Sequence, residues 1–156
     1  MSEISWRCLP FAALTPGELY ELLQLRTEVF VMEQGCLFQD MDGTDAQALH
    51  VLGHRDGALV AYARCFAAGI KFAEASIGRV ITRQSLRGTG AGHVLMRQAI
   101  KCVFAEWGGQ AIRIGAQGRL EKFYTQHGFE MAGLPYIEDG IPHVEMLRPF
   151  FIQEQT

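Results

Sequence analysis

A glycine-rich segment in the middle of the chain contains the residue types that bind a phosphate. It runs from Arg87 to Gly92 as Arg-Gly-Thr-Gly-Ala-Gly, between an apolar run and a segment with helical spacing of apolar residues. A glycine-rich turn before a helix offers unpaired backbone N–H groups and the positive end of the helix dipole. A larger side chain at Gly90 or Gly92 would push a phosphate off these donors. The segment therefore predicts a phosphate-binding loop.

Two common nucleotide-binding patterns do not fit this loop. A P-loop needs Lys followed by Ser or Thr after its last glycine, but Gly92 is followed by His93 and Val94. The G-x-G-x-x-G register of a dinucleotide site is also absent from the segment. The pattern that remains is Arg-x-x-Gly-x-Gly.

A second segment supplies a hydroxyl group and completes a resemblance. Residues 119–129 read Arg-Leu-Glu-Lys-Phe-Tyr-Thr-Gln-His-Gly-Phe, which predicts a short helix that carries Phe123 and Tyr124 and is stopped by Gly128. With the loop, this segment resembles the GNAT family of acyl-CoA N-acyltransferases, whose loop signature is Gln or Arg, then x-x-Gly-x, then Gly or Ala. Residues 30–34 and 138–143 are similar to the ElaA-type branch of that family.

The resemblance covers nearly the whole chain and implies a fold and an activity. The implied fold is the GNAT fold, a single α/β (α+β) domain over residues 1–156, with a mixed, mostly antiparallel central sheet of about six or seven strands flanked by helices. The implied reaction transfers an acetyl group from acetyl-CoA to a primary amine by direct attack in a ternary complex, without a metal. The acceptor, a small molecule or a peptide, is not disclosed by these segments.

The position of the cofactor follows from the same resemblance. In the family the pantetheine arm pairs with the main chain of the strand before the loop, and the pyrophosphate meets the loop amides. The N–H of Val80 is then the expected donor to the thioester carbonyl. The expected cofactor-binding residues are Val80, Ile81, Thr82, Arg87, Gly88, Thr89, Gly90, Ala91, Gly92 and Tyr124.

Acyl transfer to an amine also needs a proton donor and a base. Tyr124 matches the family's position for the donor, because a tyrosine with a pKa of about 10 stays protonated at neutral pH and can give its proton to the departing thiolate. The sequence offers four candidates for the base and does not choose among them: Glu74, Glu33, His143 and Glu145. Glu145 shares a face of the last predicted strand with His143.

Charge is distributed unevenly around these segments. Between Glu74 and Glu106 the chain has no acidic residue, and its bases there are Arg79, Arg83, Arg87, Arg97 and Lys101. Between Arg26 and Arg55 it has no Lys or Arg, and its acids there are Glu28, Glu33, Asp40, Asp42 and Asp45. We expect an anionic cofactor near the first interval and a cationic acceptor near the second.

The elements that must position these residues follow from apolar periodicity and turn signals. Asp56-Gly57 is a hairpin signal, and Thr15 with Glu18 forms a capping box at a helix start. The predicted order is β-α-β-β-β-α-β-α-β-β. The expected strands are 4–11, 48–53, 58–67, 76–82, 111–116, 129–132 and 143–147. The expected helices are a first one that starts at Pro16, a long one that carries Leu95 to Trp107 and ends at Gly108-Gly109, and a short one over 119–127.

Composition disfavours several other classes of protein. The 156 residues are 49% hydrophobic with a net charge of −3, which predicts one domain without the basic field of a nucleic-acid-binding protein. No segment approaches the roughly 20 apolar residues of a membrane span, and the first residues lack an apolar signal region, so we expect a cytoplasmic protein with no membrane partner. Four cysteines lie far apart without neighbouring histidines, which favours reduced thiols and no metal site. The sequence leaves open whether the protein forms a homodimer.

Two other functions remain as alternatives. Residues 25–30 also resemble the opening of acyl-homoserine-lactone synthases, although those proteins lack the Arg-x-x-Gly-x-Gly loop. A non-catalytic acyl-CoA-binding module is the other alternative, and turnover with an amine would separate it from an enzyme.

Overall fold

The first helix begins at the capping box that the sequence predicts. In the computed structural model, which describes residues 3–151, helix α1 (Pro16–Arg26) follows Thr15. The Thr15 hydroxyl oxygen accepts a hydrogen bond from the Glu18 amide at 3.1 Å, and the Glu18 carboxylate accepts one from the Thr15 amide at 2.9 Å. The helix continues into a π-helical segment, η2 (Thr27–Glu33). The predicted helix start is therefore confirmed.

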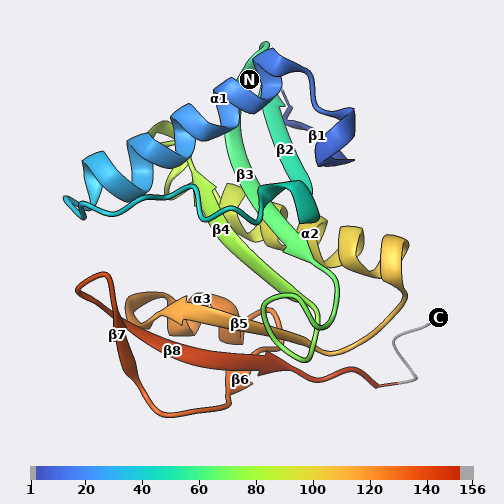
Figure 1. Ribbon diagram of the computed structural model, residues 1–156, viewed down its shortest axis with the longest axis vertical. Coiled ribbons are helices and arrows are strands. Elements are labelled where there is room, and N and C mark those ends of the chain that lie inside the picture. Colours follow the sequence, from blue (N-terminus) through green and yellow to red (C-terminus); the bar gives the residue numbers. More distant parts are fainter. Residues whose placement is uncertain (1–2, 152–156) are drawn as a thin grey trace.

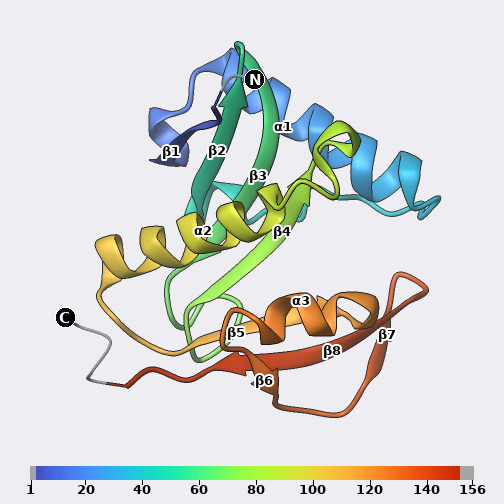
Figure 2. The same ribbon diagram turned by 180° about the vertical axis from the view of Figure 1, so that it is seen from behind.

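Four antiparallel strands form the sheet on which α1 packs. In space, as along the chain, they are β1 (Ser5–Pro10), β2 (Leu49–Arg55), β3 (Ala58–Phe66) and β4 (Ser76–Thr82). The β2–β3 hairpin turns at Asp56 and Gly57, which have φ angles of 52° and 80°, as the Asp-Gly signal predicts. Helix α1 covers one face of this sheet and α2 (Ala91–Trp107) lies on the other (Figure 1, Figure 2). Both faces of β3 are therefore buried, which explains its long apolar run.

The second half of the chain forms another sheet. Its strands pair in the order β5-β8-β6, and β7 is added on β8. A short helix, α3 (Glu121–Thr125), follows β5 and lies on one side of this sheet (Figure 2). The strands are β5 (Ile112–Gln117), β6 (Glu130–Met131), β7 (Tyr136–Glu138) and β8 (Ile141–Arg148). The short 3-10 helices are η1 (Phe11–Ala13), η3 (Asp45–Gln47), η4 (Gln84–Leu86) and η5 (Gly118–Leu120).

The two sheets meet at one parallel bridge within residues 3–151. Ala75, just before β4, pairs with Ile112, and the Arg113 amide donates to the Ala75 carbonyl oxygen at 2.8 Å. Beyond this bridge β4 and β5 diverge (Figure 1). The sequence predicted one central sheet of about six or seven strands, whereas the described residues form two sheets of four strands within the expected α/β class. Apolar periodicity identifies strands but does not report where two neighbouring strands separate.

One strand was not predicted. Strand β7 pairs with β8 through a turn at Asp139 and Gly140, which have φ angles of 50° and 76°. The Asp-Gly hairpin signal is present here too, but the three-residue strand is too short to show an alternating pattern. The hairpin extends β8, which begins at Ile141 rather than at the expected His143.

A disulfide joins Cys8 on β1 to Cys102 on α2. Their Cα atoms are 6.4 Å apart, and their sequence separation is 94. The expectation of four reduced thiols is wrong for this pair, whereas Cys36 and Cys65 are free. Sequence spacing could not show the pairing, because it depends on how α2 packs against the face of the sheet to which Cys8 points.

Apolar clusters fill the layers on both faces of the first sheet. Leu22 and Leu25 of α1 pack with Tyr62 on one face, and Leu95 and Val103 of α2 belong to a larger cluster on the other face. The helices thus use an apolar side against a sheet.

Within residues 3–151 no helix has the length and apolarity needed to cross a bilayer.

Candidate active site

Two cavities open where β4 and β5 diverge. The first has a volume of about 470 Å³ and lies toward the glycine loop, α2 and α3. The second has a volume of about 500 Å³ and lies toward the β7–β8 hairpin and the 38–42 segment. The residues that line both cavities are Phe30, Val80, Gln117, Leu120 and Tyr124. The two cavities therefore share a wall at β4, β5 and the start of α3.

The first cavity is lined by six of the predicted cofactor-binding residues. They are Val80, Ile81, Thr82, Arg87, Gly92 and Tyr124. The other four, Gly88, Thr89, Gly90 and Ala91, form the turn that leads from η4 into α2. The structure thus brings the predicted strand, loop and helix residues together around one cavity.

The glycine loop has unused backbone donors. Gly88 and Gly90 have φ angles of 81° and 85°, in the left-handed region that favours glycine. Among the described residues, the amides of Gly88, Gly90 and Gly92 donate to no protein acceptor. Because α2 begins here, the positive end of its dipole faces the same place. This arrangement is a preformed anion site that fits the pyrophosphate of a nucleotide cofactor.

Strand β4 carries a bulge at the shared wall. Arg79 and Val80 together face Ala63 of β3, because the register of the two strands shifts there. Arg79 has a φ of 50°, in the left-handed region that is uncommon for residues other than glycine. The edge of β4 that faces β5 has no strand partner beyond the bridge at Ala75 within the described chain. Its backbone groups are therefore available to an extended ligand.

Tyr124 lies between the two cavities with an unpaired hydroxyl group. Its ring packs edge to face against Phe123 and Phe129, with ring centroids 5.1 Å and 5.8 Å away. Burial raises the pKa of Tyr124 to about 12. The hydroxyl makes no hydrogen bond to any other residue in the part of the chain that the structure describes. It stays protonated at neutral pH and can donate to a group that enters either cavity.

Gln117, which sequence reasoning missed, adds a polar group to the same wall. Its Nε2 donates to Gln34 Oε1 at 3.3 Å, while its own Oε1 is buried without a hydrogen-bond partner in the described chain. A buried acceptor without a donor costs about 1–3 kcal/mol, which an N–H group of a ligand can offset. The only sequence signal is its place at the end of an apolar strand, which does not identify a site.

Glu33, one candidate for the base, lies on the cofactor side. Its carboxylate accepts a hydrogen bond from Arg87 Nη2 at 2.6 Å, and the same Nη2 donates to the Thr82 carbonyl oxygen at 3.3 Å. Glu33 and Arg87 both line the first cavity, and neither is among the residues that line the second. Glu33 therefore holds the guanidinium group beside the glycine loop.

Glu74, another candidate, is not brought to either cavity. It accepts hydrogen bonds from Nε and Nη2 of Arg113, both at 3.0 Å, and Arg113 Nη1 donates to Glu145 at 2.9 Å. The hydrogen bonds from Arg113 lower the pKa of Glu74. Glu74 and Glu145 thus stabilise the contact between strands near the start of β5, outside the site.

His143 is the base candidate that lines the second cavity. Its Nδ1 lies 2.7 Å from the Ile141 carbonyl oxygen, which can only accept, so Nδ1 carries the proton and Nε2 of the neutral ring has a free lone pair. The ring stacks on Tyr136, and Nε2 lies 3.7 Å from a carboxylate oxygen of Glu138. His143 can therefore take a proton from a group in the second cavity.

The acid-rich segment is paired with basic residues from other elements. The ion pairs join Arg26 to Asp40 and Asp45, Arg64 to Asp42 and Asp45, Lys71 to Asp42, and Arg79 to Asp40 and Asp42. Burial alone would raise the pKa of Asp42, but hydrogen bonds from Arg64, Thr44 and Lys71 hold it well below its usual range. These aspartates do not form the free acidic surface that the sequence suggested for a cationic acceptor.

Sequence reasoning also missed Arg64 as part of the second cavity. It is the only charged residue within the apolar strand β3, and a buried arginine is rare unless it is paired. That signal was available, but the partners of Arg64 are Asp42 and Asp45, in the segment before β2, and the sequence does not show this contact. Within residues 3–151 no group of three or more His, Cys, Asp or Glu side chains is arranged to hold a metal ion.

Comparisons with known proteins agree with the geometry. A family model described as an acetyltransferase (GNAT) domain matches residues 19–148. A UPF0039 protein of Synechocystis is 40% identical over 146 residues, which cover 93% of this chain and 95% of that protein. The crystal structure of Escherichia coli ElaA has a TM-score of 0.87 and 40% identity, and the match covers 93% of this chain and 99% of that chain. A crystal structure of an acyl-CoA N-acyltransferase from Pseudomonas aeruginosa has a TM-score of 0.88 and 41% identity, with the same coverage.

Proposed function

The chain belongs to the GNAT acetyltransferase family, which uses acyl-CoA as cosubstrate, and we propose that it transfers an acetyl group from acetyl-CoA to a primary amine by direct attack. The observation that carries this proposal is the unpaired Tyr124 hydroxyl in the wall between the two cavities. In this proposal acetyl-CoA occupies the first cavity and the amine occupies the second.

The residues of the first cavity bind and orient the donor. The free amides of the glycine loop donate hydrogen bonds to the pyrophosphate, Arg87 lies beside it, and the open edge of β4 pairs with the pantetheine amides. The bulge at Arg79 leaves the Val80 amide without a register partner, so that it can donate to the thioester carbonyl oxygen.

The reaction needs two proton transfers, one to sulfur and one from nitrogen. The amine nitrogen attacks the carbonyl carbon, a C–N bond forms, and the C–S bond breaks with its electron pair on sulfur. Tyr124 gives its hydroxyl proton to that sulfur. His143 Nε2 takes the proton that the nitrogen loses, directly or through a water molecule, and solvent returns a proton to Tyr124.

Acetyl-CoA binding is the first test of this proposal. Acetyl-CoA at about 100 times its Kd should stabilise the fold by about 2.7 kcal/mol, measured as a rise in melting temperature. Gly90→Val should abolish the rise, and Gly57→Val is its matched control, since both glycines have φ near 80° with open space at the Cβ position. If NAD or ATP stabilised the protein and acetyl-CoA did not, the proposal would be wrong.

Turnover separates an enzyme from a binding module. A panel of primary amines should release free thiol from acetyl-CoA, and mass spectrometry should find the acetylated amine. Binding of acetyl-CoA without turnover of any amine would favour the non-catalytic module. A lactone product would favour the acyl-homoserine-lactone-synthase-like alternative.

A further inference from the structure

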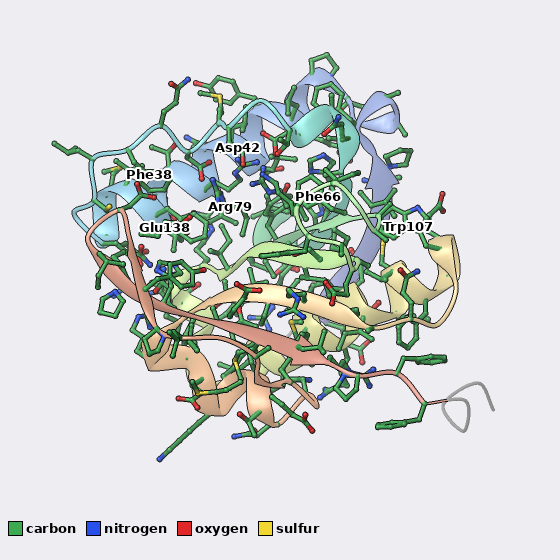
Figure 3. All side chains as sticks on the ribbon, turned by 60° about the horizontal axis from the view of Figure 1, so that its bottom comes forward. Phe38, Asp42, Phe66, Arg79, Trp107 and Glu138 are labelled. Carbon is green, nitrogen blue, oxygen red and sulfur yellow. A yellow bond between two sulfur atoms is a disulfide. The ribbon has the colours of Figure 1, made fainter. Side chains whose placement is uncertain are left out.

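The second cavity has two walls of different charge. One wall, from β3, β4 and the loop between them, carries Arg64, Lys71 and Arg79. Asp42 lines the cavity beside these bases, and the opposite wall, from the β7–β8 hairpin, carries Glu138, Asp139 and His143. Figure 3 shows Arg79 next to Asp42, with Glu138 on the hairpin opposite them. A ligand in this cavity therefore lies between a basic wall and an acidic wall.

The basic wall keeps a net positive charge after its ion pairs are counted. The linked network contains four cations, Arg26, Arg64, Lys71 and Arg79, and three carboxylates, Asp40, Asp42 and Asp45. Four minus three leaves one positive charge. No other Asp or Glu of the described chain joins this network. That charge attracts an anion.

Two guanidinium donors of this wall are unused. The Arg64 side chain is only 3% exposed, and its Nε has no hydrogen-bond partner in the described chain. Arg79 donates through Nε and Nη2 to Asp40, while its Nη1 makes no hydrogen bond to another described residue. The Arg64 donor is enclosed by protein, and buried donors are normally paired. The Arg79 Nη1 atom is not among the buried unpartnered atoms, so it is the accessible donor with which an oxyanion of a ligand would pair.

Aromatic rings complete the lining of the second cavity. They are Phe30, Phe38, Phe66, Phe72, Tyr124 and Tyr136. Arg64 and Lys71 lie over the Phe66 ring, 5.0 Å and 5.2 Å from its centroid, so the basic wall also has an apolar surface. The cavity is thus suited to a small molecule with an apolar body and charges at two ends.

We propose that the acceptor is a small zwitterion, a primary amine that also carries an oxyanion, either a carboxylate or a phosphate. This inference rests on the proposed function. The oxyanion binds at Lys71 and Arg79, and the amine lies at the other wall, near His143 and Glu138 and within reach of the thioester at Tyr124. Gln117 Oε1 supplies an acceptor for an amine N–H at the shared wall.

A matched series of amines tests the oxyanion. Thiol release from acetyl-CoA is measured with L-phenylalanine, its methyl ester and 2-phenylethylamine, which share one body. The amine of the methyl ester is less basic than the amine of phenylalanine, and the amine of phenylethylamine is more basic. A preference for phenylalanine over both compounds therefore cannot be explained by the basicity of the amine. Ethanolamine and O-phosphoethanolamine form the phosphate arm. In at least one arm kcat/KM should be about tenfold or more higher for the compound with the oxyanion.

Lys71 is the residue to change, because its side chain is 30% exposed and its loss leaves the buried arginines in place. Lys71→Met should lower kcat/KM at least fivefold for the oxyanion-bearing amine and leave it unchanged for the amine without one. Lys71→Glu should reverse the preference. Lys101→Met on α2, outside both cavities, is the matched control and should change neither value.

The outcomes separate this inference from the proposed function. The zwitterion proposal would be wrong if amines without an oxyanion had an equal or higher kcat/KM. It would also be wrong if Lys71→Met lowered kcat/KM equally for both kinds of amine. Either result would leave the proposed acetyl transfer unaffected. Acetyl-CoA binding with no turnover across both arms would also overturn the zwitterion proposal. Failure of acetyl-CoA to bind would overturn the proposed function and the inference together.

Discussion

Two buried tyrosines show how the surroundings of one hydroxyl group decide its use. The Tyr62 hydroxyl lies 2.6 Å from Nδ1 of His50, a buried pair that packs under α1. The Tyr124 side chain is also buried, but it lines both cavities and its hydroxyl has no partner in the described chain. Burial raises the pKa of both groups. Tyr62 is therefore committed to structure, whereas Tyr124 has a proton to give.

Tyr124→Phe should remove that proton donor and keep the packing. We expect kcat to fall about 10²-fold or more while the affinity for acetyl-CoA stays nearly unchanged, because the ring contacts with Phe123 and Phe129 remain. Steady-state kinetics with saturating acetyl-CoA measures this. Tyr62→Phe is the control, and it should lower the melting temperature but not kcat. Loss of acetyl-CoA affinity at unchanged kcat would instead assign Tyr124 to binding.

In the proposed complex the carboxylate of Glu33 would compete with the phosphates of acetyl-CoA for Arg87, since both would bind the same guanidinium group. Glu33→Gln should therefore lower KM for acetyl-CoA about two- to fivefold, equivalent to about 0.5–1 kcal/mol, and leave KM for the amine unchanged. Glu28→Gln breaks the neighbouring pair with Arg83, outside both cavities, and is the matched control. A rise in KM for the amine would return Glu33 to the role of an acceptor-side base.

At the scale of elements, the sequence predicted the features that depend on residues close together in the chain. The Thr15 capping box, the Asp56-Gly57 hairpin and strand 76–82 all appear where the sequence predicts them. The bulge at Arg79 and the separation of β4 from β5 were not predicted. Both depend on pairing between strands that are far apart in sequence, and the residue types within β4 do not report it. Six of the ten predicted cofactor-binding residues thus line one cavity, whose shape the sequence does not show.

The capping box can be tested as an element. Thr15→Ala removes the acceptor for the Glu18 amide and should lower the free energy of unfolding by about 1 kcal/mol, measured by urea denaturation. Thr15→Ser keeps a hydroxyl group and should retain most of the stability. If the alanine and serine variants were equally stable, the hydrogen bond at the helix start would contribute nothing measurable.

At the scale of the whole molecule, charges that are separate in the sequence become one network. The sequence showed an acid-rich interval and a base-rich interval, and each suggested its own ligand. The fold instead pairs Arg79 of the base-rich interval with Asp40 and Asp42 of the acid-rich interval, and it pairs Arg64 with Asp42 and Asp45. This changes the expected character of the acceptor from a simple cation to a molecule that also carries an anion. Linear charge patterns cannot reveal such a change, because it arises from long-range contacts alone.

The disulfide is the other long-range feature, and it links the first strand to α2. A cross-link that closes a loop of about 100 residues restricts the unfolded chain by up to about 4.7 kcal/mol. Reduction, or Cys8→Ser, should therefore lower the free energy of unfolding by several kcal/mol, whereas Cys36→Ser, at a free thiol, should change it little. Thiol titration of the unfolded, unreduced protein should find two reactive thiols, Cys36 and Cys65, and four after reduction. Four reactive thiols before reduction, with equal melting temperatures for wild type and Cys8→Ser, would show that the two sulfur atoms are neighbours without a bond.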